Sequence, residues 1–595
     1  MHIDLSPLLI SLATTFTATA ATFVLGVLAA RRLYGVRGSM RAWIDGILTL
    51  PLVLPPTVVG FFLLLLFGRR SPIGQALEHL GISIVFSWPA TVIAATVVAF
   101  PLMYRTTLGA FEQVNPTLLD AARTLGASEW TVFRRVLVPL AAPGLVAGTV
   151  LAFARAMGEF GATLMLAGNI PGRTQTMPMA IFSAAEGGDM RVAAVWAALI
   201  VVLSLAIIRL LHYEAKTRPR HVEHELPASA APIAMAARID GAHGRLEAQL
   251  ERRLENFTLR VDLAAERGAV GLLGPSGAGK SITLRMLAGV ARPDSGRVVL
   301  NGRVLFDSAN GVHVPAAQRK VGVVFQDYAL FPHMTVAENV GFSLRALASA
   351  ERTARVEALL LSLHIAELRH RLPREISGGE RQRVALARCL AMEPDALLFD
   401  EPFAALDPHL RRQTEEQLRA TLADFRGAVV FVTHDMEEAF RFCSDLLVLD
   451  QGRVIASGAK HDLFERPRSV AAARLTGCKN IAPAMRIGAR RIAVPQWACE
   501  LETAADVSEE LTHVGYRSHQ LRFVERADDA NVFPCWLVSS SEAPHEMTLY
   551  LRLHAEGNTA HVQADVAKEL WRTLSARPQP WFVQLAPERL LLLES

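Results

Sequence analysis

Residues 274–281 have the types and spacing that bind phosphate groups. They read GPSGAGKS, which fits the pattern G-x-x-x-x-G-K-S/T. The glycines let backbone N–H groups close around phosphate oxygens, Lys280 is expected to reach the β- and γ-phosphates, and Ser281 is expected to hold Mg²⁺. We therefore predict a nucleotide phosphate site with these members: Gly274, Pro275, Ser276, Gly277, Ala278, Gly279, Lys280 and Ser281.

Two acidic residues, Asp400 and Glu401, end the apolar run in ALLFDEP further along the chain. A carboxylate at the end of a strand can hold Mg²⁺ directly or through water. A second carboxylate can polarise the water that attacks the phosphorus atom. We therefore predict Asp400 as a metal ligand beside Ser281, and Glu401 as the catalytic base.

Both groups of residues need elements that hold them in place. The apolar run AVGLL, residues 269–273, precedes the phosphate-binding stretch, and a helical pattern follows it. This is the order of a strand–loop–helix phosphate cradle, in which a helix N-terminus faces the anion. ALLFD, residues 396–400, predicts a second strand, so an α/β domain is expected in this half of the chain.

Further motifs around these residues resemble those of the ATP-binding-cassette (ABC) ATPases. SGGERQR, residues 377–383, is similar to the family's signature motif, with Glu380 where the family usually has Gln. VVFQDYALFPHMTVAENV resembles the glutamine-loop region, with Gln326 as its glutamine. ALDP resembles the D-loop, with Asp407, and VTHD resembles the switch region, with His434. The motifs follow the family order along the chain.

This resemblance implies how ATP is bound and hydrolysed. ATP, with Mg²⁺, lies between two ATPase domains, with the phosphate loop on one and the signature segment on the other. Because the chain has one such domain, it is expected to act as a homodimer. Gln326 joins Ser281 and Asp400 at the metal, and His434 joins Glu401 in catalysis. The implied ATP contacts outside the phosphate loop are Gln326, Ser377, Gly378, Gly379, Glu380 and Asp407.

The family normally stacks adenine on an aromatic residue before the phosphate loop. The stretch ERRLENFTLRV offers Phe257, while Leu254 stands nearer the expected place. Phe257 therefore has two interpretations, adenine stacking and a plain core role.

The first 213 residues are apolar runs broken by short basic patches. A membrane span needs about 20 apolar residues. Five runs qualify: 8–30, 44–67, 86–109, 141–167 and 191–212. A shorter run, 175–186, is expected to be interfacial or re-entrant, and Pro51, Pro55 and Pro56 are expected to kink the second span. A sixth membrane helix stays open.

The placement of arginines predicts the orientation of the spans. Basic residues cluster at 31–41, 123–135 and 216–220, and the positive-inside rule puts these segments in the cytoplasm. The N-terminus is then outside and the C-terminus inside, which five spans satisfy, although Arg69 and Arg70 in an outer loop go against the rule. The protein is therefore expected in the cytoplasmic (inner) membrane, with its ATPase and C-terminal domains in the cytoplasm.

The polar segment 116–140 between two of these runs carries a helix with a break. DAARTLG and RRVLVPL resemble the cytoplasmic coupling loop of ABC importers, with these residues in the family's positions: Asp120, Ala121, Ala122 and Gly126. Asp120 replaces the usual Glu, and Gly126 is expected to turn the chain. The resemblance implies that this helix docks in a cleft of the ATPase domain, as in importers and not exporters. The alternative is a solvated interfacial loop.

Longer stretches of the membrane half resemble permeases of one substrate class. LPLVLPPTVVGFFLLLLFGRRSPIG and FARAMGEFGATLMLAGNIPGRTQTMPMAIFSAAEGGD resemble molybdate permease subunits, and the ATPase half resembles the molybdate ATP-binding subunit. The resemblance implies a permease–ATPase fusion that imports molybdate with the help of an extracytoplasmic molybdate-binding protein. Importers of sulfate or tungstate remain alternatives, as does an ATP-dependent, anion-sensing membrane regulator that transports nothing.

Arg155 and Glu159 lie four residues apart in the fourth apolar run and share a helix face. Ionisable residues at membrane depth are costly, so they usually face the bundle interior and pair with one another. The two residues are therefore interpreted as a structural ion pair or as part of a gate or anion path.

The last residues of the chain alternate apolar and polar positions in short runs such as RIAVPQW and TLYLRLHA, which predicts a small β-barrel. HVGYRSHQLRFVE resembles the oligonucleotide-binding (OB)-like accessory domains of importer ATPases. Two roles stay open, a domain that binds the oxyanion and inhibits uptake, and a dimer-stabilising module without a ligand.

The composition agrees with this division. Hydrophobic residues make up 51% of the 595 residues, and the net charge of +4 gives no reason to expect a nucleic-acid partner. The five cysteines form no CxxC pair, so neither disulfides nor a zinc site are expected. The predicted domains are an all-α polytopic permease domain at 1–213, a linker at 214–240, an α/β P-loop ABC ATPase domain at 241–476 and an OB-like β-barrel domain at 477–595.

Overall fold

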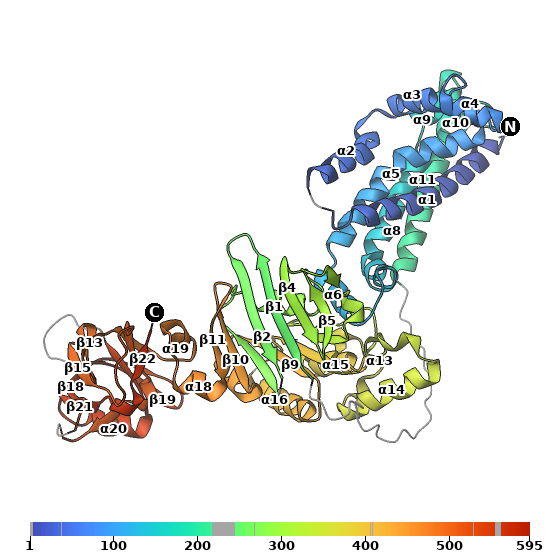
Figure 1. The fold of residues 1–595 in the computed structure, drawn as a ribbon. Helices are drawn as coiled ribbons and strands as arrows, with labels where there is room; N and C mark the ends of the chain where they lie inside the picture. Colours follow the sequence, from blue (N-terminus) through green and yellow to red (C-terminus); the bar gives the residue numbers. More distant parts are fainter. Residues whose placement is uncertain are drawn as a thin grey trace. The chain divides into compact units, whose positions relative to one another are not determined.

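The computed structural model describes most of the chain (Figure 1). The described residues are 4–36, 38–216, 244–266, 268–404, 406, 408–526, 529–553 and 561–594. The chain divides into two compact units, one comprising Met1–Leu119 and Glu129–Ala228 and the other Asp120–Ser128 and Ser229–Ser595. Most of the predicted linker, from residue 217 on, and Asp407 of the predicted D-loop lie outside the described residues.

Three long helices form the centre of the first unit: α1 (Ser6–Leu33), α5 (Trp88–Glu112) and α8 (Val138–Met157). α5 packs against both α1 and α8, and it buries small residues such as Ala94 and Ala95. The hydroxyls of Thr14 on α1 and Thr91 on α5 lie 2.8 Å apart and hydrogen-bond. Small and hydroxyl-bearing residues of this kind let membrane helices approach closely.

The other helices of the membrane half are shorter or less packed. They are α2 (Ser39–Val53), α3 (Pro56–Phe67), α4 (Pro72–His79), α6 (Pro116–Thr124), α7 (Glu129–Val132), α9 (Gly161–Ala167), α10 (Met177–Glu186) and α11 (Met190–Lys216). α10 confirms the short helix predicted at 175–186.

Fewer helices than predicted have the length and composition of a membrane span. Among the described residues three stretches do: Ser6–Leu33, Trp88–Glu112 and Glu129–Met157. The pair α2 and α3 makes a fourth if it is counted as one span, and the apolar stretch Met190–Ala206 of α11 is shorter. Over this part of the chain, the structure thus has three such helices, or up to four spans with the bent pair, and the fifth predicted run, 191–212, lies within the 27-residue helix α11.

The second predicted span, 44–67, is not one helix. α2 ends at Val53, α3 begins at Pro56, and the two helices are bent by 113°. Leu54 and Pro55 between them are extended, with ψ of 142° and 138°. Because proline has no N–H and pushes the preceding residue out of the helical region, the two prolines end α2. The predicted kink is a complete break, so this pair is a broken span or a re-entrant loop.

The fourth predicted span, 141–167, has different ends. The helical stretch begins at Glu129, runs through a π-helical segment, Phe133–Leu137, and ends at Met157. The second half of the predicted polar loop is therefore helix. The last seven residues of the predicted span form the separate helix α9.

An 11-stranded sheet runs through the second unit, in the order β6-β5-β4-β1-β2-β11-β10-β3-β9-β8-β7. Its strands are β1 (Leu246–Arg253), β2 (Thr258–Ala265), β3 (Ala269–Leu273), β4 (Ser295–Leu300), β5 (Arg303–Asp307), β6 (Val312–His313), β7 (Val321–Val324), β8 (Ala396–Asp400), β9 (Ala428–Thr433), β10 (Asp445–Asp450) and β11 (Arg453–Ala459). β3, β9, β8 and β7 are parallel neighbours, and all their residues are buried. Both strands predicted from the sequence, at 269–273 and 396–400, are confirmed.

The direction of these strands positions the candidate site. β3, β9 and β8 run side by side in the same direction, so their carboxyl ends meet at one edge of the sheet. The phosphate loop, Asp400 and the residues after Thr433 therefore come together from distant parts of the sequence. The helices of the ATPase are α12 (Lys280–Leu287), α13 (Val336–Val340), α14 (Ser349–Ser362), α15 (Gly378–Leu390), α16 (Pro408–Ala423), α17 (Met436–Phe442), α18 (Lys460–Glu465) and α19 (Val470–Leu475).

The C-terminal residues form three small sheets, with strand orders β12-β16-β22, β13-β14-β15 and β17-β21-β18-β19-β20. Their strands are β12 (Asn480–Pro483), β13 (Met485–Gly488), β14 (Arg491–Val494), β15 (Cys499–Glu502), β16 (His513–Tyr516), β17 (Arg522–Val524), β18 (Val532–Glu542), β19 (Glu546–Arg552), β20 (Val562–Ala567), β21 (Trp581–Gln584) and β22 (Leu591–Leu593), with one helix, α20 (Lys568–Ser575). The short strands are thus confirmed, but these separate sheets do not establish the closed OB-like barrel. All five cysteines of the chain are buried free thiols.

Candidate nucleotide-binding site

The loop between β3 and α12 is shaped by its glycines. Gly277 and Gly279 have φ of 83° and 106°, a backbone conformation that side chains disfavour. A Cβ on Gly274 would lie 2.2 Å from the carbonyl oxygen of Leu449, which leaves no room for any other residue. Residues 275–277 are exposed, and a Cβ on Gly277 would meet no atom within 4 Å. The loop therefore offers open backbone to a ligand, as a phosphate cradle requires.

Lys280 is buried, and its own loop holds its ammonium group. Nζ donates to the carbonyl oxygens of Gly274 at 2.8 Å and Pro275 at 2.9 Å. An ammonium group has three donors, so one donor remains for a phosphate oxygen. Burial lowers the pKa of Lys280, while the charges of Glu401 and Asp400 act in the opposite direction.

Ser281 and Asp400 come together as predicted. The Ser281 hydroxyl donates to Oδ1 of Asp400 at 2.8 Å, across 119 residues of sequence. Burial raises the pKa of Asp400, and the hydrogen bond from Ser281 counters that rise. A hydroxyl and a carboxylate are hard oxygen ligands, the type that Mg²⁺ prefers together with water.

Glu401 and His434 also meet. Oε2 of Glu401 lies 3.1 Å from Nδ1 of His434, the carboxylate being largely buried and the imidazole exposed. Glu401 has a φ of 45°, a left-handed conformation that is rare for a residue with a side chain, and its N–H donates to the carbonyl of Val432 at 2.9 Å. Backbone strain of this kind is often found at functional sites. The carboxylate is thus fixed at the edge where the phosphate loop lies.

The signature segment forms the start of α15. The Ser377 N–H and hydroxyl both donate to Oε2 of Glu380, at 2.7 Å and 2.8 Å, in a capping box. The backbone hydrogen bond from Ser377 holds the pKa of Glu380 below its usual range. Among the described residues, no hydrogen bond or ion pair joins this segment to the phosphate loop. Gln326 is exposed two residues beyond the end of β7.

Two parts of the chain match known families. Residues 259–404 match the ABC transporter family, and residues 22–218 match the binding-protein-dependent transport system inner membrane component. The chain is 44% identical over 223 residues to a probable sulfate/thiosulfate import ATP-binding protein of Chlorella vulgaris, a match that covers 37% of this chain and 92% of that protein. The chain belongs to the ABC transporter family.

Other relatives of this ABC transporter carry different substrates in their names. A molybdenum import ATP-binding protein of Paramagnetospirillum magneticum is 41% identical over 222 residues, which cover 37% of this chain and 61% of that protein. An Fe(3+) ions import ATP-binding protein of Agrobacterium fabrum is 39% identical over 265 residues, which cover 44% of this chain and 69% of that protein. The transporter is thus an ATP hydrolase coupled to import. Because the names of these relatives give different substrates, they do not identify the substrate of this chain.

The residues predicted for coupling lie in the same compact unit as the ATPase. That unit includes Asp120–Ser128, although the residues on either side belong to the first unit. Ala121 and Ala122 are buried, and Gly126 has a φ of 83°, so it breaks the helix as predicted. A Cβ on Gly126 would lie 3.6 Å from the carbonyl oxygen of Ala317.

The membrane ion pair of the transporter is formed. An Nη atom of Arg155 lies 2.7 Å from Oε2 of Glu159, and the side chains are 30% and 2% exposed. The second carboxylate oxygen accepts a hydrogen bond from the N–H of Ala162 at 2.8 Å. Glu159 therefore joins the end of α8 to the start of α9, a contact that the sequence pattern did not reveal.

The structure gives Phe257 a packing partner, which leaves both interpretations of that residue open, and it shows a role for Arg388 that the sequence did not predict. Phe257 packs on the backbone of Gly452, where a Cβ would lie 2.3 Å from the phenylalanine ring. Arg388 on α15 is buried and donates to the carbonyls of Tyr328 and Ala329, both of which have positive φ. Burial lowers the pKa of Arg388 to about 10. Arg388 thus connects the segment after Gln326 to the signature helix. The sequence feature that could have predicted this role is an arginine on the apolar face of RVALARCL.

Proposed function

We propose that this ABC transporter imports an oxyanion, with molybdate as the first candidate and sulfate or tungstate as alternatives. The observation that carries the proposal is the joining, in one chain, of this ATPase to membrane stretches that resemble molybdate permeases. Relatives named for molybdenum and for sulfate/thiosulfate support the oxyanion class. The partly exposed guanidinium of Arg155 supplies a positive charge in the membrane unit.

Uptake by reconstituted vesicles tests the substrate. The full chain would be reconstituted with ATP inside the vesicles and a candidate anion-binding protein outside, and uptake of labelled molybdate would be measured against sulfate, tungstate and Fe³⁺ as competitors. Molybdate uptake that sulfate displaces only weakly is expected. Uptake of Fe³⁺ instead would overturn the oxyanion proposal, and ATP hydrolysis with no uptake of any anion would favour the sensing regulator.

We propose the following roles at the ATP site. Glu401 accepts the proton of the attacking water, and His434, which contacts it, orients the carboxylate toward the γ-phosphate. Lys280 uses its remaining N–H to bind phosphate oxygens. The loop backbone from Gly274 to Gly279 supplies further N–H donors.

The residues present fit a magnesium ion. Ser281 and Asp400 would hold it, because their oxygens already meet at 2.8 Å beside the phosphate loop, and Gln326 would be a third ligand. When bound, the ion neutralises charge on the β- and γ-phosphates. Asp400 must be ionised for this role, so its burial-raised pKa predicts weaker metal binding at acid pH.

We propose that two copies close on ATP, with the signature segment Ser377–Glu380 of one copy facing the phosphate loop of the other. The start of α15 suits a γ-phosphate because its free N–H groups carry the positive end of the helix dipole. Asp407 is proposed to contact the same interface. A cysteine pair introduced at Ser276 and Gly378 should crosslink between copies with ATP and not without it, and ATP-independent crosslinking would contradict the proposal.

Asp120–Gly126 is proposed as the coupling segment that passes this closure to the membrane helices. Its place in the unit that holds the ATPase supports the role. Gly126→Pro, which cannot adopt a φ of 83°, should uncouple uptake from ATP hydrolysis, whereas the exposed Ser128→Pro should do so less. Equal uptake per ATP in wild type and Gly126→Pro would count against it.

The C-terminal sheets are proposed as an OB-like accessory domain over about 477–595, with the ATPase domain before it. Its two roles, an anion sensor and a dimer-stabilising module, are separated by titrating the full chain with molybdate in the presence and absence of residues 477–595. A saturable site that disappears with the truncation supports the sensor.

A further inference from the structure

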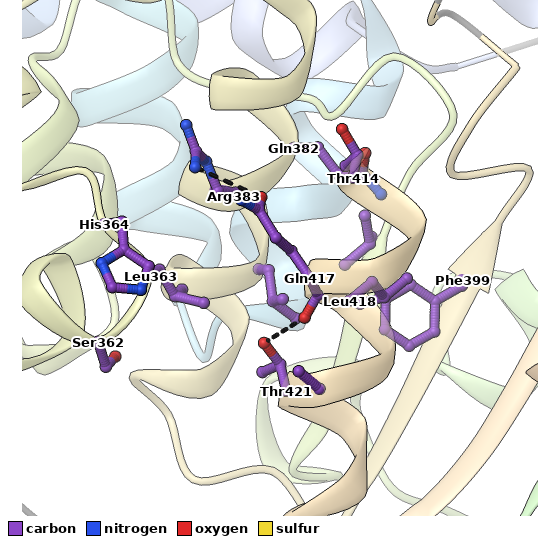
Figure 2. A pocket seen from close by; sticks show the side chains of 13 residues that line it. Ser362, Leu363, His364, Gln382, Arg383, Phe399, Thr414, Gln417, Leu418 and Thr421 are labelled. Atoms are coloured by element: carbon purple, nitrogen blue, oxygen red, sulfur yellow. Dashed lines mark hydrogen bonds between the residues drawn. The ribbon is translucent and has the colours of Figure 1, made fainter. Parts of the chain in front are cut away.

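A cavity of about 130 Å³ lies in the ATPase and is lined by residues other than those assigned to ATP (Figure 2). Its walls come from the ends of β7 and β8, the turn after α14, and facing sides of α15 and α16. Most of the wall is apolar, with Leu386 and Leu418 on the two helices and Phe399 on β8. The cavity is therefore a mostly apolar space where two strands, two helices and one turn meet.

One polar side chain in this wall has no partner. Gln382 on α15 is 3% exposed, and neither its amide nitrogen nor its amide oxygen has a hydrogen-bond partner among the described residues. A buried amide without partners is rare in folded proteins and costs stability. The carboxamide of Gln382 thus offers two donors and an acceptor beside an apolar space.

Several other polar groups of the wall are already engaged, although Nε of the partly buried Arg383 has no hydrogen-bond partner among the described residues. The Thr421 hydroxyl donates to the carbonyl of Gln417 at 3.0 Å, and an Nη atom of Arg383 donates to the side-chain oxygen of Gln417 at 3.4 Å. The Ser362 hydroxyl donates to the carbonyl of Leu359 at 3.0 Å. Gln382 has both of its polar side-chain atoms without a partner, so it is the buried side chain through which the cavity would recognise a polar ligand.

We propose that this cavity binds a small, planar molecule that carries a carboxamide or lactam group on an apolar ring. A cavity of about 150 Å³ with apolar walls accepts one benzene-sized ring, so the size fits. An amide on that ring supplies the acceptor and the donor that Gln382 lacks. A cationic ligand is disfavoured because the wall holds the guanidinium of Arg383 and no carboxylate to replace the hydration of a cation.

The site is distinct from the ATP site but adjoins it. Val324 and Phe399 in the cavity wall stand two residues before Gln326 and one residue before Asp400. The cavity also lies along α15, which begins at the signature segment. The proposal rests on the cavity and on Gln382, and it stands even if the transported substrate is not an oxyanion.

A matched pair of probes tests the proposal on the full chain in lipid nanodiscs. Benzamide and acetophenone have nearly the same shape, but only benzamide donates an N–H. Binding would be titrated by ligand-observed saturation-transfer NMR, in the millimolar range expected for ligands with so few atoms. Benzamide should bind about tenfold more tightly than acetophenone, since one or two hydrogen bonds distinguish them.

Two variants locate the binding. Gln382→Met keeps the side-chain length and should erase the preference for benzamide. Ala420→Phe places a ring at the cavity wall on α16 and should abolish binding of both probes, whereas Ala423→Phe, an exposed alanine of the same helix outside the wall, should leave binding unchanged.

Three results would overturn the proposal. The first is the absence of saturable benzamide binding, which would mean that water alone satisfies Gln382. The second is equal binding of the two probes, and the third is binding that persists in Ala420→Phe. ATP hydrolysis and the thermal unfolding midpoint of each variant establish that it is folded, and Ala420→Phe remains informative if Gln382→Met does not fold.

Discussion

The phosphate loop and the membrane ion pair each place a cation near an acid, but they are built in different ways. Lys280 is held by two carbonyls of its own loop, and the nearby acids, Asp400 and Glu401, come from the end of one other strand, β8. Arg155 is held by Glu159, one helical turn away, and Glu159 also binds the start of α9. At the ATP site, the acids take part in catalysis, and the fold of the loop does not depend on them. In the second the acid is part of the scaffold, so substitutions should separate function from stability only in the first.

Glu401→Gln breaks this comparison if the ATPase acid proves structural. We expect ATP hydrolysis to fall by about 10²- to 10⁴-fold, because the amide cannot accept the proton of the attacking water. ATP binding and the unfolding midpoint should change little, since the amide keeps the size of the carboxylate. Steady-state hydrolysis and equilibrium binding of labelled ATP measure the two effects. Glu416→Gln, an exposed position on α16, is the control, and near-normal turnover in Glu401→Gln would contradict the role.

Arg155→Ala tests the other side. It leaves the carboxylate of Glu159 buried without its cation, so we expect a loss of about 2 kcal/mol in stability, less than for a fully buried pair because Arg155 is 30% exposed. Thermal unfolding of the detergent-solubilised chain measures it. Arg155→Ala combined with Glu159→Gln should recover part of the loss, because no buried charge then remains. If Arg155→Ala abolishes uptake at full stability, Arg155 belongs to the anion path instead.

Two glycines of the phosphate loop sharpen the comparison within the ATPase. Gly277→Ala should cost about 1 kcal/mol, the price of a side chain at positive φ, since its Cβ would meet no atom within 4 Å. Gly279→Ala should cost measurably more, because its Cβ would lie 2.7 Å from Cδ1 of the buried Leu259. Denaturant unfolding of the two variants gives the difference. Equal losses would mean that Leu259 moves aside.

The phosphate site could be predicted from the sequence because its information is local. Eight consecutive residues fix a loop of one shape, and the apolar runs before the loop and before Asp400 specify buried parallel strands whose carboxyl ends meet. The contact of Glu401 with His434 follows from strand order, which motif spacing does not contain. The role of Arg388 depends on two left-handed residues far along the chain, so it could not be predicted either.

The membrane half was harder to predict because hydropathy depends on composition and does not show where the chain changes direction within an apolar run. Pro51, Pro55 and Pro56 stand in one apolar run, and all three were expected to kink a single span. The structure keeps Pro51 inside α2 and breaks the chain only at the Pro55–Pro56 pair. Adjacent prolines remove two successive donors, whereas one proline is tolerated in a helix at the cost of a kink. The end of α8 was missed because Glu159 was interpreted only as a partner of Arg155, whereas its carboxylate also accepts a hydrogen bond from the first turn of α9.

Glu380→Gln should give the smallest change in the free energy of unfolding. It tests whether one acid of the ATPase has a structural role. The Ser377 N–H and hydroxyl donate to the Glu380 carboxylate, which holds the pKa of that group low. A carboxyl whose pKa is lower in the folded state stabilises the fold above its unfolded pKa, and that stabilisation is lost as pH falls through the folded pKa. Glutamine also completes a capping box, so at pH 7 the variant should lose only a few tenths of a kcal/mol.

The pH dependence of stability in the wild type and in Glu380→Gln decides whether the carboxylate is held by Ser377. Because Glu380 loses its charge in acid and glutamine has none to lose, the stability gap between the two chains should stay constant from pH 7 down to the ordinary glutamate pKa of 4.5 and close as pH falls further, through the lower pKa of folded Glu380. Thermal unfolding of the ATPase at several pH values would measure it, with Glu351→Gln in the first turn of α14 as a control that forms no cap hydrogen bond. A gap that stays constant with pH would show that the carboxylate is not held by Ser377. Faster ATP hydrolysis at unchanged stability would mean that the negative charge of Glu380 repels the γ-phosphate. Glu380 would then affect catalysis and not the stability of the fold.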